Sequence, residues 1–408
     1  MDPHVLTPSK EDKLSSKFTR AASAAAAIAL FAFGTAGCSD SAAEDDGAAA
    51  GGAATVKLGF MGDLTGPNKA LGINIRNGAV LAIDQYNATN PATKIELIDY
   101  DSQGDPKQAT ALAPKAIDDG IVGLIGPAFS GETADTGATW EEAGIPFVSA
   151  SATRVALSEN GWTTFHRVLA DDGFQGPGVA NFILKGLSAT KVAVIDDASE
   201  YGKGLADELA AAVASGGAEV AVREAVAATG TEIPNYSSVI SAIKGAGVDA
   251  VFYGGYYAQS GAFAKQLKDG GVTAPFISGD GSLDQAFIDG AGGAADGSYL
   301  SCTCALVNEA ATGAAATFFT DYTAMFDVDP GTYSPEGFDA ATVFINGVKE
   351  GKTTSADLLT YVSAVNFAGV SKQIEFEANG NIKGGTVLMY KIVDGKITPI
   401  GTTDDATA

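Results

Sequence analysis

The sequence predicts an α/β protein with two Rossmann-like lobes, joined by crossing segments, and a ligand site in the cleft between the lobes. Three observations support this prediction. From Thr55 onward, short runs rich in Val, Ile and Phe alternate with longer Ala-rich amphipathic stretches. The alternating series starts again after Asp171, and further helices and a hairpin follow it. The chain beyond Thr55, about 350 residues, also exceeds what one hydrophobic core usually organises.

The residues before this fold have the layout of a secretory signal peptide, predicted at 1–37. Four basic residues precede an uncharged, Ala-rich run that is shorter than the roughly 20 residues of a membrane-spanning helix. The sequence Thr35-Ala36-Gly37-Cys38 resembles a bacterial lipobox, although Thr35 stands where Leu is usual. By that resemblance Cys38 would carry a lipid and anchor the protein outside the cytoplasmic membrane. Residues 38–54 are small and acidic, and we expect a flexible linker there.

The first lobe is predicted to comprise residues 55–170 and 307–384. Asp105 is a suitable N-cap, because Pro106 would take the first helical position, where a missing N–H costs nothing. The predicted strands lie at 56–62, 94–101, 122–127 and 146–151, and the helices at about 72–88, from 106, from 130, and at about 314–326, 337–349 and 355–363.

The second lobe is predicted to comprise residues 171–306 and 385–408. Within it, Asp394-Gly395 is a strong two-residue turn signal for a hairpin over 386–400. The other predicted strands lie at 191–197, 218–226, 249–255, 275–280 and 298–304, and the helices near 174–186, 201–215, 236–245 and 258–270.

Composition argues against several classes of function. The formal charge of −24 repels nucleic acid and anionic lipid headgroups, so no nucleic-acid partner is expected. His166 is the only histidine beyond the predicted signal peptide, which disfavours histidine-based metal sites and catalytic triads. No Gly-x-Ser-x-Gly sequence is present, and the acidic run at 327–331 lacks the ligand spacing of a calcium loop. We therefore expect neither an enzyme nor a cofactor.

Beyond Cys38 the chain contains two cysteines, Cys302 and Cys304. On a strand, these residues would share a face with their Cα atoms about 6.6 Å apart, near the upper limit for a disulfide. A bond between them would be strained, and a metal would need more ligands than the neighbourhood offers. We therefore expect two buried free thiols.

Hydroxyl side chains follow two strands of the first lobe. Ser130 stands at a predicted helix start, where free N–H groups favour an anion, and Ser151 and Thr153 follow the next strand. None of these hydroxyls has a base beside it, so nucleophilic catalysis is unsupported. Each could simply cap a helix or a turn. Together they suit a carboxylate.

The strand ends of the second lobe differ in chemistry. Asp280 is flanked by glycines and suits an ammonium group, or it could stabilise its own Asp-Gly turn. Asp172, at the predicted crossing between lobes, could add a second acceptor. Tyr201 and Tyr256 each follow a strand and could wall a pocket. A ligand that matches both lobes is a zwitterion, which indicates an amino acid.

Seven segments, taken jointly and in this order, resemble the type I periplasmic (substrate-binding) proteins of branched-chain amino acid ABC transporters, the leucine/isoleucine/valine-binding protein family. The resemblance runs from about Val56 to Ile400 and therefore covers nearly all of the predicted mature chain. The segments that carry it are GDLTGPNKALG (62–72), DYDSQGDPKQA (99–109), GLIGPAFSGET (123–133), DDGFQGP (171–177), YGKGLA (201–206), VFYGGYY (251–257) and FISGDGS (276–282).

The resemblance implies roles for these residues. Ser130 and Thr153 would hold the ligand carboxylate, and Asp280 would replace the family's Glu as the ammonium partner. Leu71 stands where the family often has an aromatic residue that packs on the ligand, and Arg154 stands next to Thr153. These two differences leave open which amino-acid side chain the site prefers. The family disulfide of the first lobe has no cysteines here. The remaining implied site positions are Asp172, Tyr201, Tyr256, Ala128 and Phe129.

The expected function is therefore extracytoplasmic capture of an amino acid, branched-chain or otherwise apolar, by a lipid-anchored monomer. Hinge closure would bring the second lobe onto the ligand, and the closed form would deliver it to the permease of an ABC transporter. Two alternatives remain on the same fold: a binder of a neutral amide or urea-type ligand, and a ligand sensor. A sensor would need a cytoplasmic output segment, and none follows Ala408.

Overall fold

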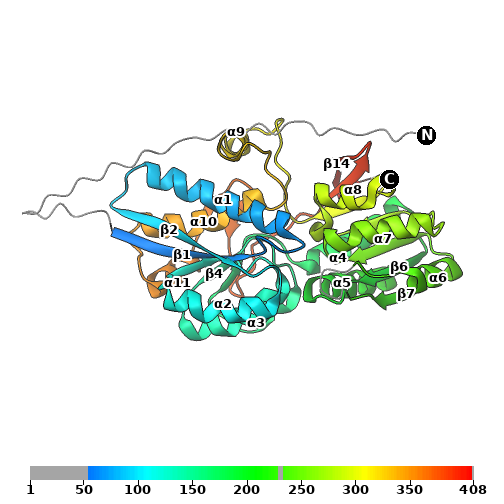
Figure 1. Ribbon diagram of the computed structural model, residues 1–408, viewed down its shortest axis with the longest axis horizontal. Coiled ribbons are helices and arrows are strands. Elements are labelled where there is room, and N and C mark those ends of the chain that lie inside the picture. Colours follow the sequence, from blue (N-terminus) through cyan, green and yellow to red (C-terminus); the bar gives the residue numbers. More distant parts are fainter. Residues whose placement is uncertain (1–53, 228–232, 407–408) are drawn as a thin grey trace, which may run out of the picture. The chain divides into compact units, whose positions relative to one another are not determined.

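The computed structural model describes residues 54–227 and 233–406 (Figure 1). The predicted signal peptide, Cys38 and almost the whole predicted linker lie outside the described residues. Ala54, the last residue of that linker, already opens strand β1. Among the helices that the structure describes, none is long and apolar enough to cross a membrane.

The first sheet contains five strands, all parallel, in the order β2-β1-β3-β4-β5. Alternate residues of β1 face opposite sides of this sheet, as a strand requires. Leu58 and Phe60 pack with Ile75 of α1, whereas Met61 packs with Trp140 of α3. The strands are β1 (Ala54–Gly62), β2 (Thr93–Asp101), β3 (Gly123–Ile125), β4 (Phe147–Ser149) and β5 (Phe165–Arg167).

Helices cover both faces of the first sheet. Figure 1 shows α1 and α10 on one side and α2 and α3 on the other, in agreement with the packing of their buried residues. Asp105 caps α2 as predicted, because its side chain accepts a hydrogen bond from the backbone N–H of Lys107 at 2.9 Å. The helices on this sheet are α1 (Lys69–Ala88), α2 (Pro106–Asp118), α3 (Ser130–Ala143), α9 (Ala314–Phe326), α10 (Ser334–Lys349) and α11 (Ser355–Val362).

The second sheet has seven strands in the order β14-β13-β10-β9-β8-β6-β7. Its last hairpin turns at Asp394 and Gly395, both with positive φ, as the Asp-Gly signal predicts. β13 runs antiparallel to its neighbours β10 and β14, and the remaining pairs are parallel. The strands are β6 (Lys191–Asp196), β7 (Glu219–Ala225), β8 (Ala250–Gly254), β9 (Phe276–Ser278), β10 (Tyr299–Cys302), β13 (Leu388–Val393) and β14 (Lys396–Thr402).

The helices of the second sheet also lie on two faces. α4 and α5 pack on one face, and α6, α7 and α8 pack on the other. The first helix starts two residues earlier than predicted, because Asp171 caps it by accepting a hydrogen bond from Gly173. These helices are α4 (Asp172–Asn181), which continues as a π-helical turn (Phe182–Gly186), α5 (Glu200–Ser215), α6 (Ser237–Ala246), α7 (Tyr257–Asp269) and α8 (Gln285–Ala291).

The two-lobed α/β class is confirmed, while several short elements have no counterpart in the prediction. These are β5, α8 and the two-stranded sheet of β11 (Asn366–Ala368) and β12 (Gln373–Glu375). Three connecting segments join the parts of the chain that build the two sheets: 168–171, 303–313 and 383–387. The lobe boundaries proposed from the sequence fall within these segments and stay a prediction.

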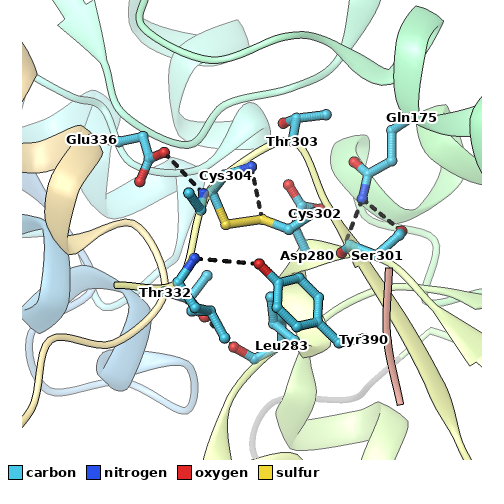
Figure 2. The surroundings of a disulfide bond; sticks show 12 residues. Gln175, Asp280, Leu283, Ser301, Cys302, Thr303, Cys304, Thr332, Glu336 and Tyr390 are labelled. Carbon is cyan, nitrogen blue, oxygen red and sulfur yellow. Dashed lines mark hydrogen bonds between the residues drawn. A yellow bond between two sulfur atoms is a disulfide. The ribbon is translucent and has the colours of Figure 1, made fainter. Parts of the chain in front are cut away.

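Cys302 and Cys304 form a disulfide, so the expectation of two free thiols is wrong. The geometric premise fails because β10 ends at Cys302 and the chain bends at the next two residues. The Cα atoms are therefore 5.0 Å apart rather than at the spacing of an extended strand. Figure 2 shows the bond with Glu336 on one side and Gln175 and Ser301 on the other.

Candidate functional site

The residues predicted from the strand ends lie just beyond the carboxyl ends of strands in both sheets. Ser130 begins α3, which follows β3, and Thr153 follows β4. In the second sheet Tyr201, Tyr256 and Asp280 follow β6, β8 and β9. This is the edge at which open α/β sheets bind ligands.

The three hydroxyls of the first lobe differ in their bonding. The Ser130 Oγ accepts a hydrogen bond from the backbone N–H of Arg154 at 3.3 Å. The Ser151 hydroxyl donates to the carbonyl of Ala128 at 2.5 Å, so its proton is already used to hold the loop after β3. The Thr153 Oγ1 is buried and has no hydrogen-bond partner among the described residues. Ser130 and Thr153 therefore retain free hydrogen-bonding capacity, whereas Ser151 supports the loop.

The loop that ends in Phe129 is held by a buried acid. Glu132 accepts a hydrogen bond from the backbone N–H of Phe129 at 2.9 Å and another from the Ser102 hydroxyl. Burial raises the pKa of Glu132 to about 7. Glu132 thus accepts from one of the N–H groups that the start of α3 leaves without a helical partner. This bond fixes the backbone of Ala128 and Phe129 beside Ser130.

Asp280 is the centre of a polar cluster in the second lobe. Its Oδ1 accepts hydrogen bonds from the Tyr201 hydroxyl at 2.5 Å and from the backbone N–H of Gly281 at 3.1 Å. Its Oδ2 is buried without a partner among the described residues. Burial raises the pKa of this carboxyl, and the hydrogen bond from Tyr201, together with the nearby Tyr333 hydroxyl and Gln175 amide, opposes that rise. One oxygen is thus fixed by the protein and the other remains free.

Asp172 is completely buried at the start of α4. Its backbone N–H donates to the carbonyl of Thr153 at 2.9 Å, which ties it to the first lobe. Neither carboxylate oxygen has a partner with good hydrogen-bond geometry among the described residues, although the nearby Thr153 hydroxyl lowers the pKa of this carboxyl. Burial raises the pKa of Asp172 well above its usual range, and the nearby charge of Asp280 raises it further. The two carboxyl groups therefore repel each other when ionised, and a cation between them would relieve the repulsion.

Aromatic side chains from both lobes meet beside this cluster. The rings of Phe129 and Tyr256 have centroids 4.7 Å apart, and those of Tyr201 and Tyr256 are 5.0 Å apart. Leu71 is fully buried near the start of α1, in one hydrophobic cluster with Phe129. The adjacent residue Ala70 donates its N–H to the Tyr257 hydroxyl at 3.0 Å, a second direct bond between the lobes.

Two candidate site residues, Tyr333 and Gln175, were not predicted from the sequence. Tyr333 lies between α9 and α10, is buried, and has a left-handed φ of 68°. Burial raises the pKa of the Tyr333 hydroxyl, and the charge of the neighbouring Asp280 raises it further. Gln175 lies on α4, and its amide stands between Asp280 and Ser301, whose Oγ is 3.0 Å away. No strand end precedes either residue, so the search at strand ends could not find them.

Arginine side chains border the site. Arg154 forms an ion pair with Glu200 of α5, which joins a loop of the first lobe to a helix of the second. Arg167 is fully buried and pairs with Asp171 at 2.9 Å. It also donates to the carbonyls of Ala152 and Arg154 at 3.1 and 2.8 Å, so it supports the backbone around Thr153.

Comparison with known proteins gives consistent results. A family model described as "Periplasmic binding protein" matches residues 55–396. The "Leucine-, isoleucine-, valine-, threonine-, and alanine-binding protein" of Pseudomonas aeruginosa is 29% identical over 341 residues, which cover 83% of this chain and 90% of that protein. The "Leu/Ile/Val-binding protein BraC3" of Rhizobium johnstonii is 34% identical over 59% of this chain and 66% of its own length.

Among solved structures, the branched-chain amino acid transporter substrate binding protein LivJ from Streptococcus pneumoniae, in complex with isoleucine, is 27% identical to this chain. The match has a TM-score of 0.77 and covers 85% of this chain and 99% of LivJ.

Proposed function

We propose that the chain, which belongs to the periplasmic binding protein family, binds an α-amino acid by its ammonium and carboxylate groups and delivers it to an ABC permease. Within that family it is a type I periplasmic binding protein of the branched-chain amino acid transporter group, and it is a binding protein rather than an enzyme. The ligand assignment rests on the chemistry of the candidate site residues, and the relatives named above for leucine, isoleucine and valine agree with it.

One observation carries the proposal: Asp172 and Asp280 are fully buried close together, and three of their four carboxylate oxygens have no partner among the described residues. Burial disfavours the charged form of both acids, and a bound cation would favour it. An ammonium group offers three donors and one positive charge, which match these three oxygens in number and sign.

The first-lobe side of the site suits an anion. Ser130 and Thr153 lie at the start of α3 and beyond β4, where a hydroxyl and free backbone N–H groups can donate to a carboxylate. Leu71, Phe129 and Tyr256 supply apolar surface beside the polar groups. This surface favours a branched-chain or other apolar side chain on the amino acid.

The proposed setting is extracytoplasmic, with the processed N-terminus lipid-anchored through Cys38 and the protein acting as a monomer. Closure of the lobes over the ligand would form the contacts seen between them, including the ion pair of Arg154 with Glu200 and the bond from Ala70 to Tyr257. The closed form would dock on the permease, and the anchor would keep it near that partner.

Calorimetric titration with four matched compounds tests the ligand assignment. Leucine should bind with a dissociation constant in the micromolar range, about −8 kcal/mol. Isoamylamine lacks the carboxylate, 4-methylpentanoate lacks the ammonium group, and isovaleramide is neutral; each should bind at least tenfold more weakly, since one charge-assisted contact contributes about 1.5–3 kcal/mol. Isovaleramide binding as tightly as leucine would instead support a binder of neutral amides.

A further inference from the structure

We infer that the Cys302–Cys304 disulfide is a positioning element for the ammonium site: it fixes the chain after β10 so that Gln175 and Asp280 keep their binding geometry. This inference rests on the proposed function, because its readout is amino-acid affinity.

The residues around the disulfide form a chain of contacts that leads to Asp280. The Ser301 hydroxyl, next to Cys302, lies 3.0 Å from the Gln175 side-chain amide and 3.3 Å from the carbonyl oxygen of Ser278. Ser278 ends β9, two residues before Asp280, and the Gln175 amide on its other side lies within reach of the Asp280 carboxyl and lowers its pKa. A change in the path of the chain at Cys302 would therefore reach Asp280 from two directions.

The same short segment is bonded to the connections between the lobes. The Thr303 hydroxyl donates to the carbonyl of Ala170 at 3.0 Å, two residues before Asp172. Lys372 donates to the carbonyl of Thr303 at 2.9 Å, and the Ala305 N–H lies 3.4 Å from a carboxylate oxygen of Glu336. Residues 301–305 thus link the ammonium site of the second lobe to the first lobe; Figure 2 shows Glu336 on one side of this segment and Gln175 on the other.

The size of the ring argues for a local role. A disulfide stabilises a fold mainly by restricting the unfolded chain, and this effect grows with the number of residues in the loop. Here one residue, Thr303, separates the cysteines, so the loop is very short and the bond should add little to the free energy of unfolding. What the bond determines directly is the path of residues 302–304.

The disulfide lies where the three connecting segments meet. A pocket of about 310 Å³ beside it is lined by residues of all three segments, among them Ala170, Thr303, Cys304 and Gly385. The two cysteines are buried beside this pocket, so the covalent link fixes the chain at the junction of the lobes.

Affinity of the full chain for leucine should be measured before and after reduction with dithiothreitol. Reduction breaks the Sγ–Sγ bond, leaves Cys302 and Cys304 as thiols, and converts the reagent to its cyclic disulfide; alkylation before and after reduction, followed by mass measurement, counts the two thiols gained and separates them from Cys38. We expect affinity about tenfold weaker after reduction, with little change in the unfolding midpoint, and recovery on reoxidation. The pH at which affinity is lost should also move, because the surroundings of Asp280 change.

Two variants complete the test. A double Cys302→Ala, Cys304→Ala variant should bind like the reduced protein and be insensitive to dithiothreitol. Val362→Ala, a truncation in α11, should lower the unfolding midpoint and leave affinity unchanged, which separates positioning from stability.

Equal affinity of the oxidised and reduced proteins would overturn the inference. So would a fall in affinity that accompanies a comparable fall in unfolding midpoint, since the bond would then be a general stabiliser. If the oxidised protein bound no amino acid, the proposed function would fail first, and the inference with it.

Discussion

Replacing Asp280 by Asn should weaken ligand binding and, at the same time, stabilise the unliganded protein. The substitution keeps an oxygen that can accept from Tyr201 and Gly281, and it removes the negative charge. Because the two effects have opposite signs, general damage to the fold cannot imitate them.

The magnitudes follow from the environment of the carboxylate. A hydrogen bond to a charged group contributes about 1.5–3 kcal/mol, so losing the ionic contact with the ammonium group should weaken binding about 10- to 150-fold. In the unliganded protein, the charge at position 280 and its repulsion with Asp172 both disappear, while the Asn amide keeps a polar group in the place of Oδ2. The gain is therefore electrostatic: a like-charge interaction that shifts a pKa by one unit is worth about 1.4 kcal/mol, which should raise the unfolding midpoint by a few degrees.

Calorimetry with leucine and thermal unfolding without ligand measure the two effects. Asp289→Asn is the matched control, because Asp289 is an exposed acid on the nearby helix α8 and should change neither quantity. Unchanged affinity in Asp280→Asn, or weaker affinity together with a lower unfolding midpoint, would refute the reasoning.

Three further predictions test separate parts of the account. Tyr201→Phe removes the hydroxyl that donates to Asp280 and should weaken leucine binding about fivefold in calorimetry, since a hydrogen bond is worth about 1 kcal/mol; unaltered affinity would exclude a role for this bond. Burial raises the pKa of Glu336 from 4.5 to about 7, so the unliganded protein should lose stability as pH rises through 7 and regain it as pH falls toward 4.5. Glu336→Gln should flatten that pH profile of the unfolding midpoint, and a profile identical to that of the unchanged protein would contradict it. Cys38→Ser should abolish labelling by a radioactive fatty acid and release or mis-process the protein, whereas normal membrane retention would defeat the anchor.

The sequence predicts most of the framework because periodicity and turn chemistry are local signals. Asp105-Pro106 marks the start of α2, and Asp394-Gly395 marks the last hairpin, since each needs only neighbouring residues to act. β5 has three residues and α8 has seven, which is too short for a periodic pattern to emerge.

The candidate site is predictable only where it follows a strand. Asp280 and Tyr201 come directly after strands, and the structure brings them into hydrogen-bond contact. Tyr333 and Gln175 reach Asp280 from a loop and from a helix, through tertiary packing that no local pattern encodes. The disulfide could not be predicted for a related reason. Its geometry depends on where β10 ends, and the ends of strands and helices are the hardest features to predict from a sequence.

The most direct test of the central claim is a crystal structure of the protein with leucine. We expect the ligand nitrogen within hydrogen-bond distance of the Asp280 Oδ2 and the Asp172 carboxylate, and the ligand carboxylate at Ser130 and Thr153. A leucine molecule bound elsewhere, or one whose nitrogen points away from both acids, would contradict the account.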